Sequence, residues 1–358
     1  MVGDRRGYGV LRGPRPVLTS GLFDSRRAGR IRDSGFTLIE VMVAMTLSAL
    51  LVAGATQLFV DGQKAYRANE RAAELQEVAR HALALLELDL RMAGYWGLSH
   101  DAARIAGAAA PDEPLPASLT QAASGISACG PNWAIHLGQH IGASDNRYTL
   151  ACAAFNRRPQ PGSDVLIVRR ASAPTAAPPT TPRLRIVANQ GQGQLVIAPC
   201  SDVRNSACTR LPPLPPFPGG QVHDLVVNAY YVSRDATGRS GLPSLRRKRL
   251  VGNASGAATQ DEEIIAGIEN LQVQLGVGDA SGAAPVQFSN PDEVDTDDTS
   301  HPIVAVRLWL LVRSDSAEPG FVDGKTREFP TGRVVAAPND AFRRLLVTTT
   351  VYLRNTRT

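Results

Sequence analysis

The sequence predicts an α+β protein in which a long N-terminal helix, membrane-spanning in its first half, packs on a β-rich globular head. Three observations lead to this fold class. Glu40 is the only ionisable residue between Phe36 and Val60. Apolar residues then recur at helical spacing as far as Leu90. Beyond residue 160, runs rich in Val, Ile, Leu and Tyr are separated by Pro- and Gly-containing breaks, which is typical of strands.

The first half of the helix, residues 36–60, is long enough to cross a bilayer. About 25 residues at ~1.5 Å each exceed the ~30 Å hydrocarbon core. The upstream flank contains Arg26, Arg27, Arg30 and Arg32, whereas acidic and basic residues are mixed on the other flank. Such a bias keeps the N-terminus in the cytoplasm. We therefore expect everything after about residue 60 to be exported.

Residues 1–35 form a leader that has no apolar stretch of its own. The leader therefore lacks the apolar region of an ordinary secretory signal. It carries eight Arg and three Asp, a formal charge of +5, and the whole chain also has a charge of +5. The rest of the chain is near neutral, so the pI of about 9.2 does not indicate a nucleic-acid-binding surface.

The second half of the helix, residues 61–94, has one apolar face. We expect the helix to end near Met92, because Gly94 follows and glycine is frequent just past helix C-termini. Asp89 interrupts the apolar face, and nothing in the sequence accounts for it. The face consists of Leu75, Val78, Ala79, Ala82, Leu86 and Leu90.

We assign residues 95–358 to a single β-rich head. Its first part, residues 101–160, is rich in Ala, Gly and Pro and predicts mainly irregular structure. Strands are expected after that part, at residues 164–170, 183–188, 194–198, 224–233, 245–251, 268–277, 303–313 and 345–354.

Four cysteines lie in the segment that we expect to be exported, where disulfides persist. They allow three pairings, and proximity along the chain favours one bond between the first two and one between the last two. No Cys-x-x-Cys occurs, which argues against a zinc or redox site. We therefore expect structural disulfides. The cysteines are Cys129, Cys152, Cys200 and Cys208.

The junction Gly35-Phe36-Thr37-Leu38-Ile39-Glu40 stands between the basic leader and the apolar run. This arrangement resembles the class III signal of type IV pilins and pseudopilins, whose cleavage site precedes the apolar segment. The resemblance implies that a prepilin peptidase cuts after Gly35 and methylates the new amino terminus at Phe36. It also implies that Glu40 pairs with the amino terminus of a neighbouring subunit during assembly. A carboxylate in hydrocarbon is costly and usually has a functional partner.

Several segments of the chain are similar to the PilW family of minor pilins, namely residues 89–97, 230–233, 244–247, 267–273, 306–310 and 343–355. The resemblance implies a type IV pilin-like fold. It further implies a minor pilin that takes part in initiation and assembly of a type IV pilus, supporting twitching motility, adhesion or DNA uptake. The implied partners are the prepilin peptidase, other minor pilins, the major pilin and the inner membrane.

The implied location is the inner membrane, crossed once with a cytoplasmic N-terminus and a periplasmic head, and then the pilus filament. A type II secretion pseudopilin of the J type shares the same leader and helix, and it is the alternative within this architecture. We expect that the protein is not an enzyme and that it needs no cofactor or metal, because common catalytic and phosphate-binding motifs do not occur in the sequence.

An acidic run precedes the strand expected at 303–313. Carboxylates are the ligands that calcium prefers, but the spacing is not that of an EF-hand. We favour a solvated loop, and calcium binding is the alternative. The run consists of Asp292, Glu293, Asp295, Asp297 and Asp298.

The densest basic cluster of the head is Arg246-Arg247-Lys248-Arg249. Such a cluster contacts phosphates in DNA-binding proteins. Flanked by Leu245 and Leu250, it also fits an edge strand, where positive charge discourages pairing with another sheet. We favour the edge strand. A DNA- or ligand-binding module on a pilin stem is the alternative from another functional class, and it would use this cluster.

Overall fold

The computed structural model describes residues 35–99, 101–175, 177, 179–198, 217–279, 285–298 and 300–355. The chain divides at Gly62 into two units, residues 1–62 and 63–358. Nearly all of the expected leader lies outside the described residues. Cys200 and Cys208 lie outside them too, so their pairing stays a prediction.

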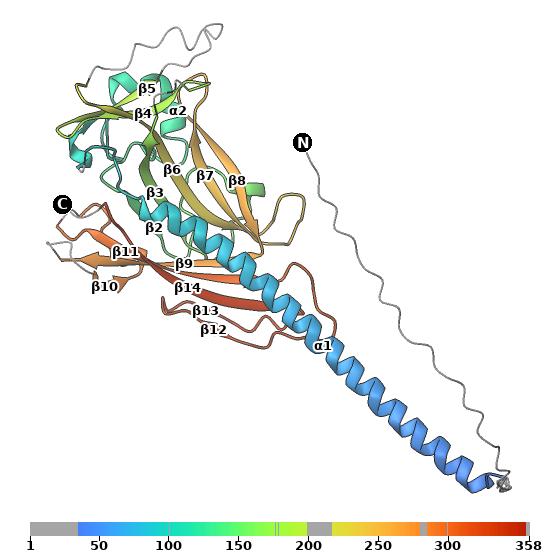
Figure 1. Ribbon diagram of the computed structural model, residues 1–358. Coiled ribbons are helices and arrows are strands. Elements are labelled where there is room, and N and C mark those ends of the chain that lie inside the picture. The colour runs from blue at the N-terminus through green and yellow to red at the C-terminus, as the bar shows by residue number, and fades with distance from the viewer. Residues whose placement is uncertain are drawn as a thin grey trace, which may run out of the picture. The chain divides into compact units, whose positions relative to one another are not determined.

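The helix α1 runs from Leu38 to Arg91 and has residues in both units (Figure 1). Within the second unit, it buries side chains at intervals of three or four residues, which confirms the predicted apolar face. A turn follows the helix, and Gly94 adopts a φ of +72° there, a conformation that favours glycine. The buried apolar residues of α1 are Leu75, Ala79, Ala82, Leu86 and Leu90.

Eight strands of the second unit form one sheet around a long central strand, β6 (Gln221–Ser233). Along one side β6 pairs antiparallel with β3 (Val165–Pro174). Its other side is shared, because β4 (Arg183–Ala188) pairs with its first residues and β7 (Ser244–Val251) with its last. The sheet continues through β5 (Gly193–Ala198) and β1 (Ile105–Ala106) beyond β4, β8 (Ala258–Ala266) beyond β7, and β2 (Ile141–Ser144) beyond β3.

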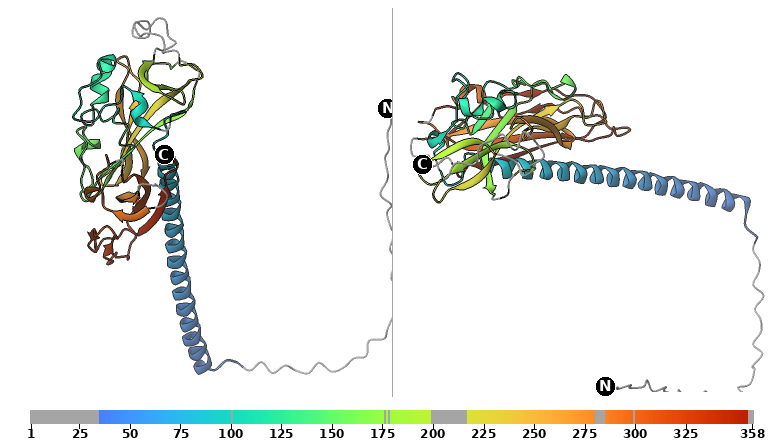
Figure 2. Two further views of the ribbon diagram at one scale, coloured as in Figure 1. Left: turned by 90° about the vertical axis from the view of Figure 1, so that its left-hand side faces the viewer. Right: turned by 90° about the horizontal axis from the view of Figure 1, so that it is seen from above.

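A second sheet has four antiparallel strands, which Figure 2 shows from two further sides. Their order is β10 (Pro285–Ser289), β9 (Ile268–Gly278), β11 (Ile303–Arg313) and β14 (Arg344–Tyr352). A separate two-stranded ribbon joins β12 (Arg327–Glu328) and β13 (Val334–Val335). The described short helices are η1 (Ala102–Arg104), η2 (Ala117–Ala122), α2 (Ala123–Ile126), η3 (Phe155–Arg157) and η4 (Pro291–Glu293).

One apolar core lies where α1 meets both sheets of the second unit. Leu86 of α1, Tyr230 of β6 and Leu308 of β11 are all buried in it. A second core fills the space between the first sheet and the segment 96–154, and Leu119, Trp133 and Val227 belong to it. The fold is therefore the α+β arrangement that the sequence predicts, with a long N-terminal helix and a β-rich head.

All eight strands expected from the sequence are present, with bounds shifted by a few residues. β8 and β10 are the longest of the strands that the sequence did not predict. The centre of β8 is polar and acidic, from Gln260 to Glu263, so it lacks the apolar alternation of a strand. β10 is short and begins with Pro285. Residues 101–160 contain short helices and only the strands β1 and β2, as expected from their composition.

Candidate functional site

The candidate processing site lies at the beginning of α1. Gly35 and Phe36 precede the helix and are exposed, Phe36 to 85%. A Cβ atom added to Gly35 would meet no atom within 4 Å. No neighbouring atom therefore explains why this residue is glycine.

The first turn of α1 is held by reciprocal hydrogen bonds between Thr37 and Glu40. The backbone N–H of Glu40 donates to Thr37 Oγ1 over 3.3 Å. In return, Glu40 Oε2 accepts from the backbone N–H and the hydroxyl of Thr37, each over 3.2 Å. This pattern is a capping box, in which the side chains of residues three apart satisfy N–H groups that a helix start leaves without partners. Its signature, Thr-x-x-Glu, stands in the sequence, so the role of Thr37 could have been predicted from it.

The first unit presents an apolar helix surface. Large apolar side chains from Phe36 to Val60 are exposed, most of them by half or more. Within the part of the chain that the structure describes, α1 is the one helix long and apolar enough to cross a membrane. Soluble domains rarely leave so large an apolar surface uncovered, so this surface indicates an environment other than water.

The acidic residue that interrupts the apolar face of α1 is buried at the centre of a polar cluster. Asp89 Oδ1 accepts from Arg170 Nε over 2.6 Å. Its Oδ2 accepts from Asn228 Nδ2 over 2.8 Å and from the Tyr230 hydroxyl over 2.9 Å. A buried carboxylate needs such partners to offset the loss of hydration. Asp89 therefore binds the end of α1 to β3 and β6, and these partners are too distant in sequence to be recognised there.

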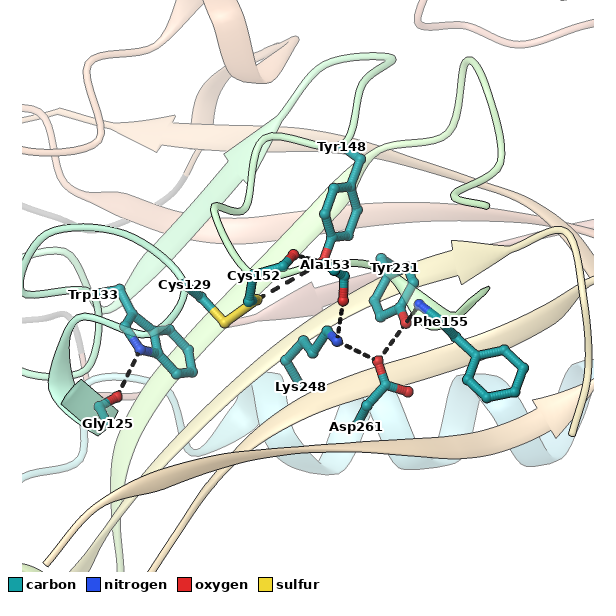
Figure 3. The surroundings of a disulfide bond; sticks show 10 residues. All are labelled: Gly125, Cys129, Trp133, Tyr148, Cys152, Ala153, Phe155, Tyr231, Lys248 and Asp261. Atoms are coloured by element: carbon teal, nitrogen blue, oxygen red, sulfur yellow. Dashed lines mark hydrogen bonds and ion pairs between the residues drawn. A yellow bond between two sulfur atoms is a disulfide. The ribbon is translucent and has the colours of Figure 1, made fainter. Parts of the chain in front are cut away.

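A disulfide joins Cys129 to Cys152, one of the two pairings that proximity favoured (Figure 3). Their Cα atoms are 4.4 Å apart. The segment after Cys152 is bound to the first sheet, because Lys248 Nζ donates to the carbonyl of Ala153 over 2.6 Å. The amide of Phe155 donates to the hydroxyl of Tyr231 over 2.9 Å. The disulfide thus joins two parts of an irregular segment that packs on β6 and β7.

The basic cluster belongs to an internal strand, so the edge-strand interpretation was wrong. β7 lies between β6 and β8. Arg246 is buried, and its guanidinium contacts Asp261 at 2.7 Å and Glu263 at 3.0 Å on β8. Lys248 Nζ lies 2.6 Å from the second oxygen of Asp261. The error has a physical reason. β8 supplies these carboxylates and pairs with the edge of β7, but its polar centre lacks the apolar alternation by which strands are recognised in a sequence.

Asp261 of β8 is the carboxylate that both Arg246 and Lys248 of β7 contact. Burial opposes ionisation of its carboxyl group. Hydrogen bonds from Lys248, Tyr231 and Arg246 outweigh the burial and hold the pKa of Asp261 below its usual range. On the other face of β7, the guanidinium of Arg247 is paired with Glu262. These carboxylates neutralise most of the charge that a phosphate backbone would need.

The acidic run contacts neighbouring loops through single side chains. Asp297 Oδ1 lies 3.2 Å from His136 Nε2, and Asp292 Oδ2 lies 3.2 Å from Arg147. Asp298 is bonded to His301 over 2.8 Å. Within the described residues, no group of three or more His, Cys, Asp or Glu side chains is arranged to hold a metal ion. This arrangement favours the loop interpretation.

Two family models match the chain. The prokaryotic N-terminal methylation motif covers residues 30–56, and type IV pilus-assembly protein W covers residues 229–355. Among solved structures, the chain is similar to a type IV-like pilin from Thermus thermophilus, with 13% identity and a TM-score of 0.34 over 79% of this chain and 97% of that one. No curated protein matches the chain. One family match at the start of its helix and another over the C-terminal part of its head support a type IV pilin of the PilW family.

Proposed function

We propose that this minor pilin takes part in the initiation and assembly of a type IV pilus, and thereby supports twitching motility, adhesion or DNA uptake. The observation that carries the proposal is the junction at Gly35 and Phe36, followed by an exposed apolar helix with one carboxylate in its first turn. The match to the methylation motif spans this junction. Such a helix needs a bilayer or the helices of other subunits around it.

In this proposal the prepilin peptidase cuts after Gly35 and methylates Phe36. Both residues are exposed, so the junction is accessible to a membrane-embedded enzyme. The N-terminus faces the cytoplasm and the head faces the periplasm, in agreement with the basic residues before the helix. Before assembly the protein is located in the inner membrane, and it then enters the filament.

Glu40 is the assembly residue in this proposal. Before assembly, the bonds to Thr37 lower the cost of holding its carboxylate in an apolar environment. During assembly, the positive amino terminus of a neighbouring minor or major pilin approaches the same carboxylate. Attraction between the two charges is strong in a medium of low dielectric constant and would fix the axial register of the subunits.

The first experiment is mass spectrometry of the mature N-terminus, in cells with and without their prepilin peptidase. We expect an N-methylated Phe36 only where the peptidase is present. Gly35→Ala should abolish processing. Gly62→Ala is the matched control, because Gly62 is also exposed, with open space around it, but lies within the helix. An intact leader in cells that contain the peptidase, or cleavage after residue 60, would contradict the proposal.

The second experiment separates processing from assembly. Glu40→Ala should leave the N-terminus processed but reduce the amount of protein in sheared pili at least about tenfold. Glu70→Ala, which removes an exposed carboxylate further along α1, should have no such effect. Normal incorporation of the Glu40 variant would rule out the assembly role.

The J-type pseudopilin of type II secretion is the alternative within the same architecture. It predicts that loss of the protein impairs secretion and leaves piliation intact, whereas the minor pilin predicts the reverse. For the DNA- or ligand-binding module, the paired charges on β7 remove the feature on which that alternative was based.

A further inference from the structure

The strands at the edges of the two sheets differ in how they are protected from pairing with other chains. Proteins protect such edges with charges, proline, bulges or short strands. The edge strand β8 carries Asp261, Glu262 and Glu263 and has a register shift. β10 begins with Pro285 and is shifted too. β1 and β2 have only two and four residues.

Apart from the charge of its first residue, Arg344, β14 lacks these devices. It is nine residues long and pairs with β11 over its whole length without a register shift. From Leu345 to Leu353 it contains no charged residue, no glycine and no proline. Its three Thr, two Val and one Tyr favour the extended conformation.

The register shows which backbone groups of β14 face outward. Leu353 N donates to Val304 O over 2.9 Å, and Ser314 N donates to Arg343 O over 2.8 Å. In an antiparallel pair, bonding and non-bonding residues alternate. The odd-numbered residues of β14 therefore bond to β11, and the even-numbered ones direct their N–H and C=O groups away from it. Within the described residues, no backbone group pairs with this outer edge, formed by Leu346, Thr348, Thr350 and Tyr352.

Space is available beside this edge. A groove of about 360 Å³ is lined by the end of β14 and the two residues after it, from Thr350 to Arg354. Glu87 and Arg91 of α1, which form an ion pair with each other, line it too. Thr348 is exposed, and Tyr352 is 56% exposed.

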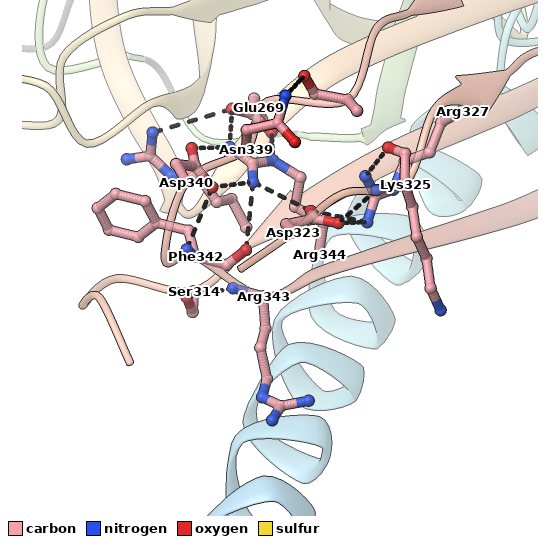
Figure 4. Close-up of polar contacts among 12 residues, drawn as sticks. Glu269, Ser314, Asp323, Lys325, Arg327, Asn339, Asp340, Phe342, Arg343 and Arg344 are labelled. Carbon is pink, nitrogen blue, oxygen red and sulfur yellow. Dashed lines mark hydrogen bonds and ion pairs between the residues drawn. The ribbon is translucent and has the colours of Figure 1, made fainter. Parts of the chain in front are cut away.

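Both ends of β14 are fixed, so the edge is already in the conformation needed for pairing. At its start, the Arg344 guanidinium bonds to Asp340 over 2.7 Å and to Asp323 over 3.1 Å (Figure 4). The Asn355 side chain, just beyond the strand, donates to the carbonyl of Ala93 over 3.3 Å. A preorganised edge binds a partner at a lower entropic cost than a mobile one.

We propose that the outer edge of β14 accepts an extended strand from another subunit of the filament. The edge offers four N–H and four C=O groups, which is sufficient for pairing with a segment of about seven or eight residues. Three charged side chains, Glu87, Arg91 and Arg354, line the groove beside this edge, and Glu87 and Arg91 form an ion pair with each other. That the partner is a pilus subunit rests on the proposed function.

Photo-crosslinking in piliated cells tests this pairing in the full-length protein. A photoreactive amino acid would replace Thr348 on β14 or, as the matched control, Gln260, an exposed residue on the protected edge strand β8. We expect the Thr348 position to crosslink to another pilus subunit at least about tenfold more than the Gln260 position. Equal crosslinking at the two positions, or crosslinking from Thr348 only to proteins outside the pilus, would overturn the inference.

A pair of variants tests the outward backbone groups directly. Thr350→Pro removes an outward N–H, and proline is tolerated at an edge position whose N–H is not paired within the sheet. Thr350→Val keeps that N–H, and both changes remove the hydroxyl that Arg307 contacts. With equal amounts of disulfide-bonded protein in the cell, we expect the Pro variant to enter pili at least about tenfold less than the Val variant.

The outcomes separate this inference from the proposed function. Equal incorporation of the Pro and Val variants would overturn the strand-accepting edge and leave the minor pilin role intact. Absence of the wild-type protein from sheared pili would overturn both. If the Pro variant fails to accumulate, crosslinking at Thr348 still decides, because that experiment keeps the native backbone.

Discussion

Thr37, Glu40 and Asp89 show how single polar side chains stabilise a mainly apolar helix. At the helix start, the carboxylate of Glu40 and the hydroxyl of Thr37 satisfy each other. Near its end, the carboxylate of Asp89 accepts hydrogen bonds from three side chains. In both places a charge avoids an unpaired state, which is costly away from water. The two carboxylates differ in how far their partners lie along the sequence. Thr37 is three residues from Glu40, whereas the partners of Asp89 lie on other elements.

The capping box predicts a measurable effect at the helix start. Thr37→Val should destabilise the first turn by about 1 kcal/mol, the usual cost of losing an N-cap side chain. Amide hydrogen exchange of Glu40, in detergent-solubilised protein, should then be about fivefold faster. Thr37→Ser keeps the hydroxyl and should exchange at the wild-type rate. Equal exchange in the Val and Ser variants would mean that the box does not stabilise the helix.

Removing the buried carboxylate should destabilise the head strongly. Asp89→Ala leaves Arg170 without its partner, and breaking a buried ion pair in this way typically costs about 3–5 kcal/mol. The control is Glu77→Ala, which removes an exposed carboxylate on the same helix and should cost less than about 1 kcal/mol. Denaturant unfolding of the full-length protein in detergent gives both values. Similar losses in the two variants would contradict the role assigned to Asp89.

At the scale of elements, β7 and β8 form one unit held together by charge. Three of the four consecutive basic residues on β7 lie opposite the three acidic residues of β8, from Arg246 opposite Glu263 to Lys248 opposite Asp261. The side chains of Arg246 and Lys248 are largely buried, and Arg246 lies 3.7 Å from the centre of the Phe155 ring. Their charges stabilise the sheet and are not displayed as a surface for an anionic partner.

The position of each basic residue on β7 predicts its effect on stability. Arg246→Ala should lower the free energy of unfolding by about 3 kcal/mol, because it removes a buried guanidinium that contacts both Asp261 and Glu263. Arg249 has a side chain 42% exposed and lies 3.9 Å from Glu262, so Arg249→Ala should cost under about 1 kcal/mol. Denaturant unfolding distinguishes the two. A surface-exposed cluster would instead give two small, equal losses.

At the scale of the whole molecule, two large apolar cores, a small cluster around Phe329 and, among the described residues, one disulfide stabilise the second unit. The core between α1 and both sheets involves elements from the whole length of this unit. The other core depends on the irregular segment 96–154, which the bond between Cys129 and Cys152 closes into a loop. A buried titratable group within this segment, His140, makes the stability of the head depend on pH.

His140 predicts the direction of that dependence. Burial lowers the pKa of this imidazole to about 4, and the charge of Arg169 contributes. In the unfolded chain its pKa is about 6.5. As the pH falls from about 6.5 to about 4, the unfolded state binds a proton and the folded state does not, so the free energy of unfolding decreases by up to about 3 kcal/mol. Above a pH of about 6.5 this contribution is constant.

His140→Gln removes the titrating group and should flatten this part of the pH profile, measured by denaturant unfolding between about pH 4 and pH 7. The control is His301→Gln, since His301 is exposed. An unchanged slope in the His140 variant would show that its protonation is not linked to folding.

The sequence by itself determined the elements that depend on local patterns. The long helix, its apolar halves, the eight strands and the junction at Gly35 follow from residues that are close in sequence. For the disulfide, proximity along the chain only favoured the pairing of Cys129 with Cys152, which the structure contains. Periodicity, helix caps and turn residues act over a few positions, so a sequence records them directly.

Only the tertiary structure decided what the charged residues do and which sheet edges are open. Arg246 and Lys248 are internal because β8 covers β7, and Asp89 is stabilised by partners on β3 and β6. β14 is an edge because no other described strand lies beyond it. The energy of a charge, or of an unpaired backbone group, depends on which groups surround it in space. Those neighbours come from distant parts of the chain, and their positions are determined only when the whole head has folded.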